Sequence, residues 1–403
     1  MAKEEKFFLA CLRFFLQKTG SPDEIRSSMG KNMDWNLILS WAQSHGVHPL
    51  LYHVLKGVNW TGIPGQVRER LESNFRANMA RNLILSAETD KVLMALEKRG
   101  IISVPLKGIF LSEEVYPDIS LRVVTDIDLL VREEDLAGAE EALVELGYCH
   151  DHSIRQVLIP NNCYTLHMEK GGRTGHNLCV ELHWGLANRR DYVLPMESWW
   201  ETVFQNTRNR YYLNGISCFR MEPEILLLYL TINAHMSRYA FLKQLVDIAQ
   251  VISHYKHDMD WDKVIGMACE LGLLDNLVFA LGLVCRMFDL QVLHVADELS
   301  NRLASGKQRI FQALFREQRL VHGKMGQDLR QFILLFLLDE KVVIRSIWKV
   351  IFSSRQAIAY RYGLSPQSYS TSVYLILNPL LSLYRLLRGF IVDSWAGKGI
   401  GRS

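Results

Sequence analysis

Three carboxylates occur on two short runs of apolar and β-branched residues. Asp126 and Asp128 lie within residues 123–131, and Glu181 lies within residues 179–184. Because side chains alternate across a strand, Asp126 and Asp128 would share one face and leave the apolar residues on the other. Carboxylates so close repel each other unless solvent or a cation neutralises them, and oxygen ligands suit Mg²⁺ or Mn²⁺. If the two runs form neighbouring strands, Glu181 completes a cluster that could hold two such ions for in-line attack at phosphorus.

Upstream, a lysine and a glycine join another short apolar run to a helical segment. Residues 101–106 form that run, and residues 109–116 have helical spacing. Backbone amides at the start of a helix, next to the flexible Gly108, form a natural cradle for phosphate. Lys107 could reach the same phosphates as a point charge. Arg122, which shortly precedes the carboxylate pair, is placed to neutralise a triphosphate oxygen or the leaving pyrophosphate.

Three further polar residues have two interpretations each. His183 shares the predicted face of Glu181, so it either lines the site or makes a structural hydrogen bond. His235 and Asp247 lie on successive predicted helices. They could form a pair that supports the site or binds an acceptor, but polar groups that are satisfied within the core are the more common case.

The elements that would position these residues fall into three parts. Residues 1–100 carry apolar residues at helical spacing, residues 101–221 alternate strands with helices, and residues 222–403 return to helical spacing. We therefore expect an α+β fold, in which N-terminal and C-terminal helical regions flank a small mixed-sheet core. Strands are predicted at 101–106, 123–131 and 179–184, and helices at 109–116, 133–146, 225–234, 241–252, 261–271 and 276–288.

The charge is unevenly distributed along the chain. Of 403 residues, 46 are Lys or Arg and 43 are Asp or Glu, but residues 301–403 hold 16 basic and only 5 acidic residues. Such a basic helical quarter could meet nucleic acid, an anionic membrane surface or the phosphates of a substrate. Seven cysteines without a CxxC pair exclude a disulfide scaffold and a zinc ribbon. No segment is typical of a signal peptide or a spanning helix, so we expect reduced thiols in a cytoplasmic protein.

In this order, these residues resemble the uncharacterised bacterial nucleotidyltransferase family of the DNA-polymerase-β-like superfamily. The likeness is strongest over residues 101–190 and extends loosely from about residue 80 to 385. It rests on residues 105–108, Tyr116 and Pro117, Arg122, residues 126–131, 146–148 and 180–184, on His235 and residues 242–248 with Asp247, and more weakly on residues 362–366. The resemblance implies a nucleotidyltransferase core with two metal ions on Asp126, Asp128 and Glu181.

The implied reaction moves an NMP group from an NTP to a hydroxyl acceptor and releases pyrophosphate. One Mg²⁺ on Asp126 and Asp128 would orient the β- and γ-phosphates, and a second, shared with Glu181, would lower the pKa of the acceptor hydroxyl. Glu181 is the candidate proton acceptor, directly or through the metal. A small molecule or a peptide is the favoured acceptor, and the sequence specifies neither the nucleotide nor the oligomeric state.

Two other classes of function stay open. The superfamily usually has Gly-Ser or Gly-Gly where this chain has Lys107 and Gly108, which permits a degenerate nucleotide-binding or regulatory module. The basic residues 301–403 permit a helical interaction protein that binds nucleic acid or a membrane surface. Nucleotide binding without turnover would distinguish the first of these, and a steep salt dependence of RNA or liposome binding the second.

Overall fold

The computed structural model describes most of the chain up to residue 290 and little beyond it. The described residues are 3–17, 21–149, 164–171, 177–186, 210–213, 216–237, 239–290, 355, 358 and 367–381. Almost all of the basic quarter that begins at residue 301 lies outside these residues, so the nucleic-acid and membrane partners expected for it stay predictions.

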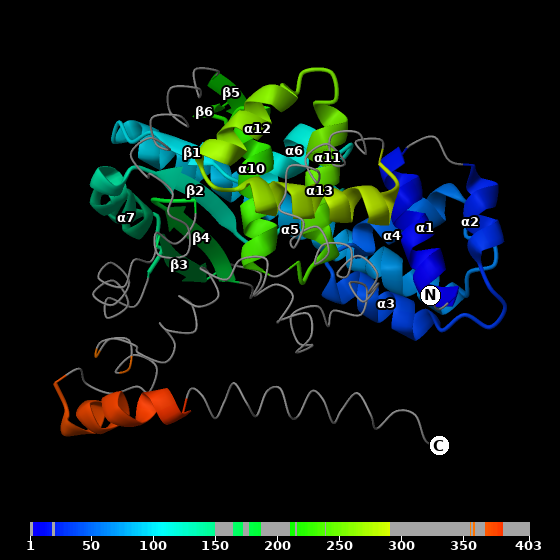
Figure 1. Cartoon of the computed structure of the whole chain (residues 1–403), viewed down its shortest axis with the longest axis horizontal. Coiled ribbons are helices and arrows are strands. Elements are labelled where there is room, and N and C mark those ends of the chain that lie inside the picture. The colour runs from blue at the N-terminus through cyan, green and yellow to red at the C-terminus, as the bar shows by residue number, and fades with distance from the viewer. Residues whose placement is uncertain are drawn as a thin grey trace.

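The described fold is α+β, as the sequence predicts, with helices around a small mixed sheet (Figure 1). The helices are α1 (Lys3–Gln17), α2 (Pro22–Ser28), α3 (Trp35–Ser44), α4 (His48–Gly57), α5 (Gly65–Lys98), α6 (Ile109–Val115), α7 (Leu136–Glu145), α10 (Pro223–Met236), α11 (Leu242–His254), α12 (Trp261–Glu270) and α13 (Leu274–Phe288), with 3-10 turns η1 (Ile119–Leu121) and η2 (Glu133–Asp135). The strands are β1 (Ser103–Pro105), β2 (Ile127–Val131), β3 (Thr165–Gly171), β4 (Asn177–His183), β5 (Arg210–Leu213) and β6 (Ile216–Phe219). None of the helices in this described part combines the length and the apolarity that crossing a membrane requires.

The four-stranded sheet brings together strands that are distant in sequence. Its order is β1-β2-β4-β3, in which β2 and β4 are parallel and both outer pairs are antiparallel. The parallel register sets Asp128 opposite Glu181. This confirms that the strands carrying the two predicted carboxylates are neighbours. The strand β3 was not predicted, and β5 and β6 pair separately as a hairpin.

The strand β2 is shorter than predicted, because its expected first half is bound to α5 instead. The carbonyl of Arg122 accepts hydrogen bonds from Asn78 and Asn82, and the carbonyls of residues 124 and 125 accept from Arg81. Backbone carbonyls satisfied by side chains in this way do not form a strand ladder. The strand therefore begins at Ile127 rather than at residue 123.

The two faces of the sheet have different roles. Ile127, Leu129, Val180 and Leu182 are buried against α5 and α7 in one hydrophobic core. The opposite face carries Asp128 and other polar side chains. The polar side chains around Asp128 therefore lie on a sheet whose other face is packed against α5 and α7.

A second hydrophobic core joins the two helical regions. Buried residues of α1 to α4 and of α10 to α13 belong to the same cluster, which also includes Val104 and Leu130 from the sheet. A direct link between the regions is the bond from Arg13 Nε to the carbonyl of Met287, 2.7 Å long. The N-terminal helices and α10 to α13 therefore pack on each other and on the part of the sheet formed by β1 and β2.

Candidate active site

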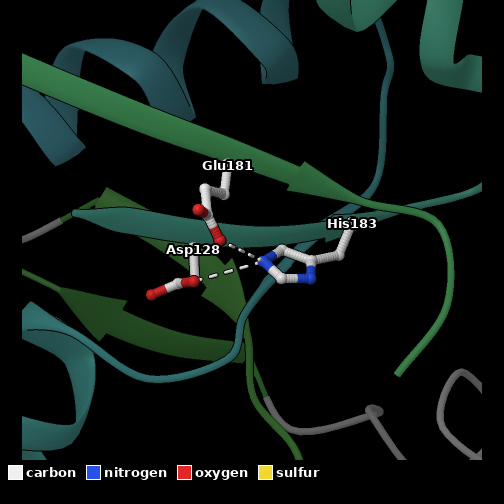
Figure 2. A group of neighbouring side chains, drawn as sticks. All are labelled: Asp128, Glu181 and His183. Atoms are coloured by element: carbon white, nitrogen blue, oxygen red, sulfur yellow. Dashed lines mark hydrogen bonds and ion pairs between the residues drawn. The ribbon is translucent and has the colours of Figure 1, made fainter. Parts of the chain in front are cut away.

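Two carboxylates and a histidine converge on the polar face of the sheet. His183 Nε2 lies 3.2 Å from Asp128 Oδ1 and 3.5 Å from Glu181 Oε2, so the imidazole points between the two carboxylates (Figure 2). One ligand atom from each of the three residues lies within 4.8 Å of the other two, the spacing of a metal-binding group. The structure thus places His183 within the cluster and beside both acids.

Lys107 is the cation of this cluster. Its Nζ lies 3.1 Å from Asp128 Oδ1. Burial opposes the charge of Lys107, but Asp128, Asp126 and Glu181 together raise its pKa above the ordinary value. Burial opposes ionisation of Asp128 as well, yet Lys107 and His183 lower the pKa of its carboxyl to about 2. Asp128 is therefore an anion that the ammonium group of Lys107 and the imidazole of His183 already approach.

Asp126 lies just outside the group. It directly precedes β2, and its Oδ1 accepts a hydrogen bond from Thr125. Burial and the nearby charge of Asp128 raise the pKa of Asp126, whereas that of Asp128 is lowered. Opposite shifts in two adjacent carboxyls are typical of functional sites. That Asp126 is a metal ligand stays a prediction.

Gly108 turns the chain against the carboxylate strand. Its φ is 68°, and a Cβ placed on it would lie 3.1 Å from the carbonyl oxygen of Asp126 and 4.0 Å from Asp128 Oδ2. Only glycine combines this backbone conformation with so close an approach. The Lys107–Gly108 pair predicted from the sequence therefore adjoins the carboxylates, although phosphate binding by it stays a prediction.

Arg122 and Asp247 form a buried ion pair behind the Gly108 turn. Arg122 Nε and Nη2 lie 2.8 Å and 2.9 Å from the two oxygens of Asp247, and Nη1 donates to the carbonyl of Gly108 at 3.2 Å. The hydroxyl of Tyr116 also donates to Asp247 Oδ1, at 2.7 Å. The sequence suggested that Arg122 neutralises phosphate, but every guanidinium nitrogen is engaged inside the protein. The geometry favours a role for Arg122 and Asp247 in holding the Gly108 turn.

His235 lies in the last turn of α10. Its ring packs edge-on against Tyr239 at 5.9 Å. Burial lowers the pKa of His235 to about 4, and the charge that opposes this shift is that of Asp275 on α13. His235 is therefore not one of the residues that converge on Asp128, and a role for it in the site stays a prediction.

The sequence reasoning missed two side chains near the cluster. His167 on β3 pairs with Glu181 across the strands, and its Nδ1 lies 3.6 Å from Glu181 Oε1. Tyr229 on α10 is buried, which raises the pKa of its hydroxyl, and it lies close enough to Lys107 and Asp128 to respond to their charges. The alternation of polar and apolar residues in β3 could have indicated His167, but no local pattern marks Tyr229.

A comparison with protein families identifies the chain. A family model described as an uncharacterised nucleotidyltransferase matches residues 31–289, well over half of the chain. The chain belongs to this family. The matched range includes the sheet, the carboxylate cluster and α11, and it confirms the resemblance found in the sequence. No curated protein and no solved structure gave a match.

The cluster of this nucleotidyltransferase-family chain fits a divalent cation. Asp128 Oδ2 is buried, has no hydrogen-bond partner among the described residues, and points away from His183 (Figure 2). A buried carboxylate oxygen without a donor is costly, so it marks a place for a cation. Two carboxylates and an imidazole suit Mn²⁺ as well as Mg²⁺. The donor set is therefore compatible with the metal that the sequence predicts, without selecting between the two ions.

Proposed function

We propose that the protein transfers an NMP group from an NTP to a hydroxyl acceptor at the Asp128 cluster. The acceptor oxygen forms a bond to the α-phosphorus, the bond from that phosphorus to the bridging oxygen breaks, and pyrophosphate leaves. The observation that carries the proposal is the pairing of Asp128 with Glu181 across parallel strands, beside His183, in a chain of the nucleotidyltransferase family.

The residues of the cluster divide the work. Asp128, Glu181 and His183 would hold Mg²⁺ or Mn²⁺, with Asp126 as a further ligand if two ions bind. A divalent ion there supplies Lewis-acid stabilisation of the phosphoryl oxygens and lowers the pKa of the acceptor hydroxyl. Hydrogen bonding from His183 lowers the pKa of Glu181, so Glu181 is a carboxylate and can accept the hydroxyl proton. Lys107 is within reach of phosphates bound above Asp128.

A second candidate follows from the position of Lys107. Its ammonium group already pairs with Asp128, as in a site where a lysine takes the place of a metal ion. Such a protein would bind a nucleotide without transferring it and would act as a regulatory module. Calorimetric nucleotide binding without turnover over a broad panel of acceptors would favour this candidate over the enzyme.

The test is transfer of label from the α-phosphate. The purified chain, Mg²⁺ and each of the common NTPs, labelled at the α-phosphate, are incubated with native lysate, and labelled products are separated. Small molecules and peptides are the favoured acceptors. We expect wild type to label one class of product and Asp128→Asn to lose at least about 10²-fold of that activity, because electrostatic stabilisation at such a centre is commonly worth this much.

A matched variant controls for the substitution itself. Glu141→Gln removes an exposed carboxylate on α7, where Glu141 pairs with Arg99 on the far side of the sheet. It should label as wild type does. Thermal unfolding of Asp128→Asn shows whether the fold survives, and undiminished transfer by a folded Asp128→Asn protein would refute the proposed function.

A further inference from the structure

A second lysine faces the same region from α11. Lys243 lies in the first turn of α11, one helical turn before Asp247, and residues four apart share a helix face. Asp247 on that face reaches Arg122, which in turn binds the carbonyl of Gly108. Figure 1 shows α11 beside α6, the helix that begins after Gly108. Lys243 therefore shares the face of α11 that carries Asp247, and it lies close enough to Asp247 and Asp126 to respond to their charges.

The charge of Lys243 has no partner in the part of the chain that the structure describes. Its ammonium group makes no hydrogen bond and no ion pair there, although the side chain is partly buried. Burial lowers the pKa of Lys243, and the nearby cations Arg122 and Lys107 add to this effect. The acids Asp247 and Asp126 act against it only in part. By contrast, Lys107 and Arg122 each contact a carboxylate. Among the described residues, Lys243 is therefore a cation near the cluster that makes no ion pair.

The N-terminal helical region fixes the stem of this lysine. The amide of Lys243 donates to the carbonyl of His45 at 3.2 Å. A Cβ on Gly46 would come within 2.9 Å of Lys243 Cδ, and the φ of Gly46 is +67°. The stem lies where any other residue at position 46 would place its side chain. A rigid stem lowers the conformational entropy that a lysine loses on binding an anion.

We propose that Lys243 binds the phosphate chain of the nucleotide and that Gly46, which has no side chain, leaves the space in which the stem of Lys243 is positioned. The identity of the ligand as a nucleotide rests on the proposed function, whereas binding of a polyphosphate does not. A triphosphate carries several negative charges, and a lysine ammonium group is a compact partner for them. Lys107 and Lys243 would then neutralise the phosphate chain from two sides, one from the turn after β1 and one from α11.

Binding of inorganic tripolyphosphate tests this without any catalytic step. Its affinity for the full chain is measured by calorimetry in Mg²⁺ for wild type, Lys243→Gln and Lys243→Arg. We expect Lys243→Gln to bind about tenfold more weakly, as for loss of one charge-assisted hydrogen bond. Lys243→Arg should stay within about threefold of wild type, because it keeps the charge. Because the ammonium group makes no hydrogen bond or ion pair with the described residues, Lys243→Gln should unfold close to the wild-type temperature.

Two outcomes would overturn the proposal, and both are separate from failure of the proposed function. One is binding of tripolyphosphate by Lys243→Gln within about twofold of wild type, and the other is no binding by wild type. Absence of label transfer in every acceptor assay, with the tripolyphosphate difference intact, would instead refute only the enzyme. It would leave Lys243 as a polyphosphate-binding residue.

A pair of glycine variants tests how Lys243 is positioned. Gly46 and Gly100 close α3 and α5 with the same backbone pattern and with φ of +67° and +69°, but a Cβ on Gly100 meets nothing within 4 Å. Gly46→Ala and Gly100→Ala should therefore lose similar stability from the backbone alone. Only Gly46→Ala should weaken tripolyphosphate binding, by several-fold. Equal affinities in the two variants would contradict the role of Gly46.

Discussion

Replacing Asp247 by Asn should destabilise the protein strongly, although the two side chains have nearly the same shape and volume. Asp247 and Arg122 are 2% and 5% exposed, and their side chains form two hydrogen bonds that join α11 to the segment before β2. The variant keeps the volume of the side chain but removes its charge, and so it leaves the guanidinium buried without a counter-ion. It also weakens the acceptor of the Tyr116 hydroxyl.

The expected magnitude follows from this burial. Breaking a buried ion pair by removing one partner typically costs about 3–5 kcal/mol, because the remaining charge stays in a poorly solvating environment. The loss of the neutral bond from Tyr116 alone would cost about 1 kcal/mol, which Tyr116→Phe measures separately. For an m value of about 2–3 kcal/mol/M in urea, the pair corresponds to a midpoint shift of about 1–2 M.

Urea unfolding followed by tryptophan fluorescence and by far-UV circular dichroism measures this shift. The matched control is Asp23→Asn, the same substitution in the exposed pair of Asp23 with Arg26, which has a similar distance of 2.8 Å. Exposed pairs contribute about 0–1 kcal/mol, so the control should barely move the midpoint. The reasoning would be refuted by a loss below about 1 kcal/mol in Asp247→Asn, since solvent or another group would then be satisfying Arg122.

Two further predictions concern backbone conformation and pH. Gly108→Ala should lose label transfer and about 1–3 kcal/mol of stability, because its Cβ would press on the carbonyl of Asp126. The control is Gly272→Ala, where φ is +66° but a Cβ meets no atom within 4 Å, so this variant should keep its label transfer. Equal label transfer by the two variants would contradict this account. Burial lowers the pKa of His48 to about 4, so the unfolded chain, with a histidine pKa near 6.5, binds the extra proton as the pH falls between these values. Stability from this residue is therefore present above pH 6.5 and lost toward pH 4, with about 1.4 kcal/mol gone at pH 5.5. Urea unfolding at pH 7 and 5.5 should show a smaller loss in His48→Gln than in wild type, and identical losses would show that His48 is not the group responsible.

The sequence predicts those parts of the site that depend on local alternation. Apolar residues at every second position of residues 127–131 and 180–184 identify both carboxylate strands and the face on which Asp128 and Glu181 lie. Helical spacing likewise predicts α10 to α13 within a few residues. These features are readable because each follows from the packing of one element against a core.

The remaining features depend on contacts between distant segments. Arg122 and Asp247 are 125 positions apart, and nothing in the local sequence of either shows that they pair. The strand β3 has only two buried apolar residues, Leu166 and Met168, so its alternation is a weak local signal, and its place at the edge of the sheet depends on pairing with β4. The hydrogen bonds from α5 that shorten β2 also join residues about 40 apart. That Lys243 makes no ion pair among the described residues is visible only once α11 is placed beside α6.

The shared core of the two helical regions has a consequence for synthesis on the ribosome. The apolar faces of α1 to α4 emerge first, but α11 and α13, which pack against α1, begin only at Leu242 and Leu274. At translation rates of about 5–20 residues per second, the nascent chain would carry those faces without their partners for about 10–30 s. Through that interval it would depend on chaperones, and a messenger truncated before α10 would yield a fragment prone to aggregation. The N-terminal helices are therefore protected from misassembly only after the late helices α10 to α13 have been synthesised.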